Sequence, residues 1–177
     1  MKKWILPAIM LVMAAPALAQ TKKPEPPQHF GVPAETEFYP QDSPKQALAS
    51  IAKAFERGRV DYLLAHLVDP GYTDPTFGKL YHGKFGKYPE DDRTLSAADR
   101  AARVKETLAD FVYVVTSERT SEPKKALRLD RLLKEGTVEE AGTTAKVTLK
   151  DDASAVLTLL QIEGRWYMSN AKSDKPK

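Results

Sequence analysis

The chain has 177 residues, of which 42% are hydrophobic and 29% are charged, and it contains no cysteine. This length and composition predict one globular domain with a sizeable core, and they exclude a disordered, collagen-like or multi-span membrane protein. Without cysteine the chain has no disulfide, no thiolate metal ligand, no thiol nucleophile and no acylation site of the lipoprotein kind.

The first nineteen residues have the pattern of a secretory signal peptide. Two lysines precede an uncharged run from Trp4 to Ala19, which ends in the small-x-small cleavage site Ala17-Leu18-Ala19. The run has 16 residues, fewer than the roughly 20 that span a bilayer as a helix. We therefore expect cleavage between Ala19 and Gln20, a periplasmic or secreted protein, and no stable membrane anchor after cleavage.

Cleavage lowers the formal net charge from +3 to +1, because Lys2 and Lys3 are removed and no acidic residue goes with them. A nearly neutral chain has no basic stripe that would release counterions from a phosphate backbone. The sequence therefore predicts no nucleic-acid partner.

Residues 20–42 contain five prolines and few aliphatic residues, which predicts an extended Pro-rich tether ahead of the domain. Some of its apolar side chains are able to dock on the domain: Phe30, Val32, Phe38 and Tyr39. The domain itself is expected over residues 43–170, followed by a polar, frayed tail over residues 171–177.

Two helices are predicted at the start of the domain. Ser43 is a typical N-cap, Pro44 suits the first helical position, and Gln46 is placed to complete a capping box. Gly58 suits the left-handed position that follows the helix. A second, short helix is expected over residues 61–68.

Residues 70–94 have a different composition, with four glycines, three prolines and five aromatic residues in 25 positions. Such a segment predicts a long Gly/aromatic-rich loop, and long loops in compact domains tend to be functional or mobile.

Helices and then strands are predicted for the remainder. Ser96 begins a helix of about five turns, and a shorter helix runs from residue 122 or 123 to residue 134, with Gly136 as its stop. After Gly136 the apolar period becomes two, which predicts strands over residues 137–140, 145–149, 155–162 and 165–169. The order predicts an α+β domain, in which N-terminal helices pack on an antiparallel C-terminal sheet.

Two short motifs carry a resemblance to a known family. They are Leu133-Lys134-Glu135-Gly136 and Gly164-Arg165-Trp166-Tyr167, which follow helices that contain Leu63-Leu64-Ala65-His66-Leu67. This layout over residues 43–170 resembles the nuclear-transport-factor-2-like (ketosteroid-isomerase-like) superfamily, and is similar to small exported bacterial members of unassigned function. The resemblance implies a cone, with a curved sheet wrapped around helices and a pocket at its open end. Because that superfamily includes both enzymes and binding modules, it does not imply one function.

Candidate catalytic residues gather near the predicted loop. Isomerases of this superfamily use an acidic base with tyrosine or acid donors in an apolar pocket, and Asp69, Asp74, Tyr81 and His82 are weak candidates for such roles. None of them matches a catalytic motif. The alternative reading is structural: Asp69 caps a helix end, Asp74 forms a turn before Pro75, and the tyrosines pack the loop.

Metal and cofactor binding are not predicted. Three histidines are too few and too scattered for a site of three or four ligands, and neither phosphate-binding glycine pattern is present. His29 is assigned to the tether, and His66 to the second helix.

The sequence favours a non-enzymatic exported domain that binds a small ligand or an envelope protein. Four aromatic residues are the candidate ligand contacts: Tyr72, Phe77, Tyr81 and Trp166. Two alternatives are an isomerase or lyase that uses a pocket aspartate with Tyr81, and a structural module that forms a homodimer.

Overall fold

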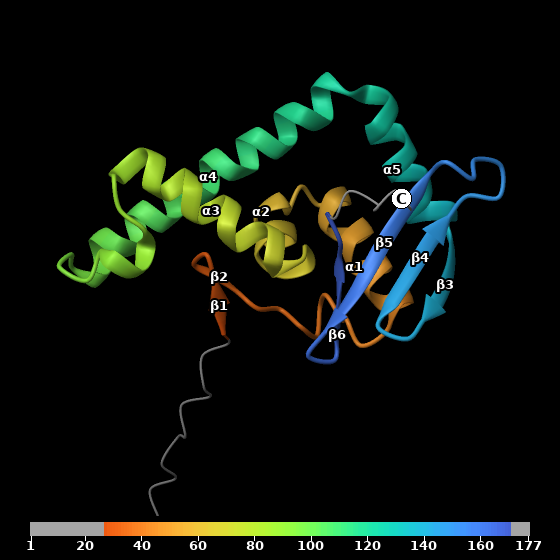
Figure 1. Ribbon diagram of the computed structural model, residues 1–177, viewed down its shortest axis with the longest axis horizontal. Coiled ribbons are helices and arrows are strands. Elements are labelled where there is room, and N and C mark those ends of the chain that lie inside the picture. The colour runs from red at the N-terminus through yellow and green to blue at the C-terminus, as the bar shows by residue number, and fades with distance from the viewer. Residues whose placement is uncertain (1–26, 171–177) are drawn as a thin grey trace, which may run out of the picture.

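The computed structural model describes residues 27–170, which form an α+β structure with a four-stranded sheet at the C-terminal end (Figure 1). The predicted fold class is therefore confirmed at the level of α+β. The predicted signal peptide, its cleavage site and the predicted tail at 171–177 lie outside the described residues. The helices are α1 (Pro44–Glu56), α2 (Val60–Tyr62), the π-helix η1 (Leu63–Leu67), α3 (Pro70–Phe85), the 3-10 helix η2 (Pro89–Asp91), α4 (Ala97–Ser121) and α5 (Pro123–Glu135).

The sheet is an antiparallel meander in the order β3-β4-β5-β6, and it confirms the predicted strands. The strands are β3 (Thr137–Ala141), β4 (Thr144–Thr148), β5 (Val156–Ile162) and β6 (Arg165–Met168). The turn between β5 and β6 has two residues, Glu163 with φ 51° and Gly164 with φ 79°. Two positive φ values are the mark of the type I′ turn that suits the twist of a hairpin.

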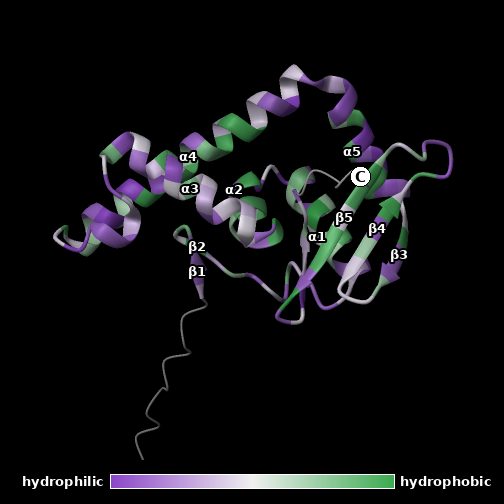
Figure 2. Cartoon of the chain, viewed as in Figure 1, coloured by the Kyte–Doolittle hydropathy of each residue, from purple (hydrophilic) through white to green (hydrophobic). Residues whose placement is uncertain are grey.

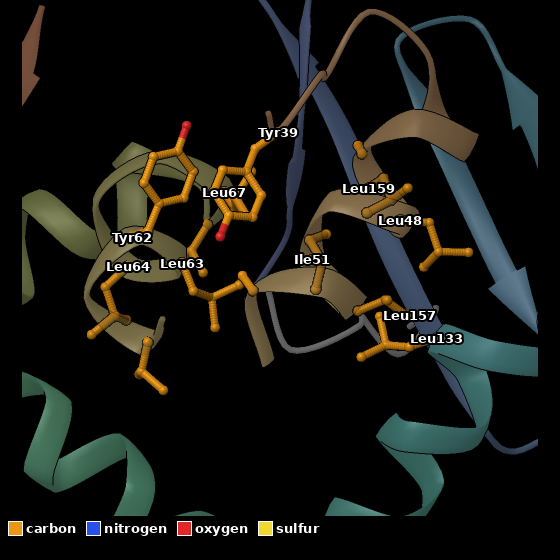
Figure 3. Packing of buried hydrophobic residues seen from close by; sticks show 14 of the residues in the cluster. Tyr39, Leu48, Ile51, Tyr62, Leu63, Leu64, Leu67, Leu133, Leu157 and Leu159 are labelled. Atoms are coloured by element: carbon orange, nitrogen blue, oxygen red, sulfur yellow. The ribbon is translucent and has the colours of Figure 1, made fainter. Parts of the chain in front are cut away.

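One face of the sheet is buried against helices. Val138, Val147 and Leu157 are register partners across three strands, and Leu159 lies between Ala145 and Met168 in another row. Helix α1 contacts β6 and β3, and α5 contacts β5. The side chains between these layers form a continuous apolar core (Figure 3).

The two edges of the sheet differ. At the β6 edge the main chain of Trp166 is bonded on both sides of its peptide: its N–H donates to the Gln41 carbonyl at 2.9 Å, and its carbonyl accepts from the Gln41 side chain at 2.7 Å. Val68 then forms an isolated parallel bridge with Met168. These contacts cover the β6 edge, whereas β3 is paired only with β4.

Helix α1 begins as its sequence predicts. The Ser43 hydroxyl accepts a hydrogen bond from the Gln46 backbone N–H at 3.3 Å, and the Gln46 side chain accepts from the N–H of Asp42. The reciprocal contact is thus one residue earlier than a standard capping box. Gly58, with φ 65°, follows the helix in the left-handed conformation, as expected.

The second predicted helix is only partly regular. One α-helical turn, α2, continues into the π-helix η1, all five of whose residues are buried. A π-helical turn is wider than an α-helical turn, so this segment brings its side chains into the core on more than one side. Leu63 and Leu64, labelled in Figure 3, belong to it.

The predicted extended tether is wrong from residue 28 onwards, whereas the docking that the sequence allowed for Val32 and Tyr39 is observed. A two-stranded hairpin, β1 (Gln28–His29) and β2 (Val32–Pro33), lies on the helices, and Val32 is buried. Tyr39 is also buried, and its ring is stacked on that of Tyr62 at 4.3 Å between centroids. Burial of these side chains holds a Pro-rich segment on the domain, so the domain includes residues well before 43.

The predicted loop over residues 70–94 is also wrong, because most of it is helix α3. The Asp69 carboxylate caps the helix by accepting from the Gly71 N–H at 2.8 Å. Thr73, Phe77 and Tyr81 are spaced by four residues and are buried on one face. This tertiary burial outweighs the poor helix propensity of the glycines and of Pro75.

Helix α4 runs from the α3 side of the molecule across to α5 and the sheet (Figure 1). It has 25 residues, but only Thr107, Leu108 and Phe111 are buried. Its apolar and polar residues are closely interspersed, whereas β5 is a largely hydrophobic strand (Figure 2). Among residues 27–170, no helix is both long enough and apolar enough to cross a membrane.

Candidate functional site

A cavity of about 330 Å³ lies beneath the junction of α4 and α5. Its other walls come from α1, η1, the start of α3 and the end of β6. The last ten residues of α4 contain no fully buried side chain, and Val115 of this part lines the cavity. Its volume is within the range of pockets that bind small molecules.

The walls of the cavity are mainly apolar. The apolar residues that line it are Phe55, Leu63, Leu64, Val68, Val115, Ala126, Leu129 and Met168. Leu63 and Leu64 are almost wholly buried and come from the π-helix. In Figure 3 these two side chains extend from the helix bundle towards α4. An apolar ligand would therefore lose water contacts on the side that faces these walls.

Charged side chains gather where α4 meets α5. Arg119 donates from Nη2 to the Asp130 carboxylate at 2.5 Å, and its guanidinium lies 4.5 Å from the centre of the Phe55 ring. Its Nη1 is buried and has no hydrogen-bond partner in the described chain. Arg119 thus joins α4, α5 and α1 at the wall of the cavity.

The remaining charges at the cavity are Glu118, Glu122 and Lys125. Lys125 forms an ion pair with Glu122, one turn before it. Glu118 forms no ion pair with a lysine or arginine of residues 27–170, and its side chain is exposed. The lining thus holds two carboxylates and two cations, and Arg119 takes its carboxylate partner, Asp130, from outside the lining.

Of the four predicted ligand contacts, only Tyr72 lines this cavity, and it is 37% exposed. Phe77, Tyr81 and Trp166 are buried in the core, with at most 4% exposure. Phe77 is stacked on Phe30 at 4.1 Å between ring centroids, so it holds the N-terminal hairpin. Trp166 fills the space between the sheet and the helices.

The candidate catalytic residues are not brought together. Asp69 caps α3, and Asp74 lies on α3 with its carboxylate 2.9 Å from Nε2 of His29. The exposed His82 ring lies 4.8 Å from that of Tyr88. Asp69 does cap a helix, but at the start of α3 and not at the end of the second predicted helix, and the turn predicted at Asp74 is wrong because α3 continues through it.

Tyr81 belongs instead to a buried polar cluster between α3 and α4. Its hydroxyl donates to the Asp92 carboxylate at 2.6 Å, and Arg103 donates to the same oxygen at 2.7 Å. Burial and the hydrogen bond to Asp92 raise the pKa of Tyr81. The Tyr81 hydroxyl, followed by Arg103, lowers the pKa of Asp92. The Tyr81 hydroxyl therefore has a structural role, because its proton is used in the hydrogen bond to Asp92.

Two histidines hold the N-terminal hairpin. His29, which the sequence assigns to the tether, hydrogen-bonds through Nδ1 to the Ala65 carbonyl at 2.5 Å and faces Asp74 through Nε2. His66 is buried, and its Nε2 lies 2.8 Å from the Val32 carbonyl. Burial lowers the pKa of His66. Within residues 27–170, no three His, Asp or Glu side chains are grouped in a way that would hold a metal ion.

Sequence reasoning missed the residues that define the cavity, above all Arg119, Glu118 and Leu129. Their spacing on α4 and α5 is that of an amphipathic helix. This pattern does not distinguish a helix face that packs on the core from one that lines a pocket. No family model matches the chain, and no curated protein and no solved structure is found to be similar to it.

Proposed function

We propose that this protein binds a small, largely apolar molecule in the cavity beneath the junction of α4 and α5, and that it does so without catalysing a reaction. The observation that carries the proposal is the bridging path of α4 over an apolar space of about 330 Å³. A concave and mainly apolar surface of this volume is typical of small-molecule sites.

The residues around the cavity favour binding over catalysis. Its polar groups are a paired arginine, a paired lysine, two glutamates, Tyr72 and Asn170. They include no histidine, serine or threonine, the side chains that most often serve as bases or hydroxyl nucleophiles. Tyr81, the donor that an isomerase would need, is hydrogen-bonded to Asp92 outside the cavity.

Filling the cavity tests the proposal. Leu129 lines the cavity, and Leu127 on the same helix is 63% exposed and does not line it. We expect Leu129→Trp to weaken binding of the neutral fluorescent probe N-phenyl-1-naphthylamine by at least about tenfold, since loss of several buried contacts exceeds 1.4 kcal/mol. The measurement is a fluorescence titration at constant ionic strength.

Leu127→Trp is the matched control, because it adds the same ring two residues away without entering the cavity. We expect this variant to keep the affinity of the unmodified chain, and circular dichroism to show that both variants are folded. Equal affinity of the two variants for the probe, or no binding of the probe to the unmodified chain, would refute the proposal.

We further propose that the protein acts after export, on the pattern of residues 1–19, and that its fold is a divergent nuclear-transport-factor-2-like cone. The support for the second point is the order of elements, helices followed by an antiparallel meander. An envelope protein as partner, or a second copy of the chain, stays an alternative to a small ligand. Fractionation of cells that make the full chain would test export by the loss of the first nineteen residues.

A further inference from the structure

The ring of His29 lies between two hydrogen-bond acceptors. Its Nδ1 is 2.5 Å from the Ala65 carbonyl of η1, and its Nε2 is 2.9 Å from the Asp74 carboxylate of α3. A carbonyl and an ionised carboxylate only accept, and a neutral imidazole has a single N–H to donate. Both contacts are therefore hydrogen bonds only when the His29 ring carries a proton on each nitrogen.

His66, the other histidine that contacts the hairpin, has the opposite requirement. It is buried, and its Nε2 lies 2.8 Å from the Val32 carbonyl, a contact for which one N–H is enough. Burial is the main cause that lowers the pKa of His66, and a charge on His29, whose ring centroid is 6.1 Å away, acts in the same direction. Near neutral pH the positive charge of the pair is therefore on His29.

Other charged groups surround the two rings. Two of opposite sign act on His66, namely Glu35 and Arg165. Two more of opposite sign line the groove beside Asp74, namely Lys79 and Glu90. Asp74 is the charged residue that is in direct contact with His29.

The hairpin depends on contacts of this kind to stay on the domain. Each of its strands, β1 and β2, has only two residues, and so short a hairpin is not stable alone. Its apolar contacts, the stack of Phe30 on Phe77 and the burial of Val32, do not change with pH. The bridge through His29 does.

We infer that the docking of the N-terminal hairpin is a pH-sensitive switch, in which the imidazolium of His29 joins β1 to the Ala65 carbonyl and to the Asp74 carboxylate. When the ring loses a proton, one of its nitrogens presents a lone pair to an oxygen, and one of the two bonds is lost. The docked hairpin thus binds the proton more readily than the open one, so docking weakens as the pH rises through the range in which histidines titrate. This inference is independent of the proposed ligand cavity.

Exchange of the Ala34 amide measures the opening of the hairpin, because its N–H donates to the Pro27 carbonyl at 2.9 Å. NMR on the full chain gives its protection factor, which is corrected for the intrinsic exchange rate, between about pH 6.5 and 8.5, where His66 is neutral. We expect the protection factor to fall about three- to fivefold over this range, as for a partly exposed ion pair. A protection factor that stays constant overturns the inference.

The ring nitrogens give a second measurement on the unmodified chain. Long-range proton–nitrogen spectra distinguish a protonated ring nitrogen from a lone pair. We expect both nitrogens of His29 to be protonated at pH 6.5 and one of them to lose its proton as the Ala34 amide loses protection. A neutral His29 at pH 6.5 contradicts the bridge.

Asp74→Asn separates the charge from the contact, because an asparagine amide can donate to Nε2. A neutral His29 can then donate from Nδ1 to the Ala65 carbonyl and accept at Nε2, so neither contact needs the extra proton. We expect the hairpin of this variant to stay docked, with a protection factor that no longer depends on pH.

Asp110→Asn is the matched control. Asp110 is an aspartate of similar side-chain exposure, 52% against 55% for Asp74, and it pairs with Lys84 on the other side of α3 from no contact of the hairpin. We expect this variant to keep the pH dependence of the unmodified chain. Full pH dependence in Asp74→Asn, or its loss in Asp110→Asn, would show that the bridge through His29 is not the switch.

Discussion

The sheet half of the molecule and the α3–α4 half share one apolar core but differ in how many side chains they bury in it. In the sheet half, α1 alone buries six of its 13 residues, and Ile51, Leu159 and Trp166 are almost inaccessible to water. In the other half, α4 buries three of 25 residues, and polar contacts link it to α3. Apolar burial is non-directional and cooperative. A helix that buries few side chains and is held by a few hydrogen bonds and ion pairs can open locally.

The largest effect is expected in the sheet half. Trp166→Ala removes a large buried side chain between sheet and helices, so we expect a loss of about 3–5 kcal/mol in the free energy of unfolding. Denaturant unfolding followed by circular dichroism measures this loss. Since the core is continuous, amide exchange should quicken throughout residues 27–170 rather than near β6 alone.

A smaller and more local effect is expected from the polar cluster. Tyr81→Phe removes the hydroxyl that donates to Asp92, and we expect a loss of about 1.5–3 kcal/mol, the range for a hydrogen bond to a charged group. Exchange should quicken mainly in α3 and the first half of α4. Uniform quickening across the sheet would contradict the division between the halves.

His66, which contacts the N-terminal hairpin at Val32, should make the stability of the protein depend on pH. Its pKa is lowered in the folded protein from an ordinary value of 6.5, so the unfolded chain binds the proton more readily. The contribution of neutral His66 to the free energy of unfolding should therefore be complete above about pH 6.5. It should decrease as the pH drops below this value. His66→Gln, which keeps a donor for the Val32 carbonyl, should have a flatter dependence between pH 5 and 7 in urea titrations.

The smallest effect is expected at the surface. Lys84 donates to Asp110 at 2.7 Å and pairs with Glu106, but all three side chains are substantially exposed. Exposed ion pairs contribute little to stability because water and salt screen them. Lys84→Met should shift the thermal midpoint less than Tyr81→Phe does, and a larger shift would show that this ion pair, too, holds the halves together.

The same contrast explains what could be predicted from sequence. The alternation of Ala145, Val147 and Leu149 is a local signal, so the strands are predicted correctly from a few residues. The four-residue spacing of Thr73, Phe77 and Tyr81 was also present in the sequence. It was outweighed by glycine and proline, because the burial that stabilises α3 depends on partners distant in the chain, such as Phe30.

The candidate site was less predictable than the fold. Tyr72 is the one predicted contact that lies at the cavity. The others are large aromatic residues, and such side chains most often fill cores, as Trp166 does. A cavity depends on the path of one helix over another, which pairwise spacing in a sequence does not encode.

The covered β6 edge limits how copies of this protein can assemble. Gln41 and Val68 use the main-chain groups to which a further strand would bind, so strand addition to the four-stranded sheet is confined to β3. Two copies that joined through β3 would use both open edges, and the assembly would end at two. Glu139 and Glu140 on that edge add like-charge repulsion, a common protection of edge strands. The four-stranded sheet therefore offers no second free edge for open-ended growth by strand addition.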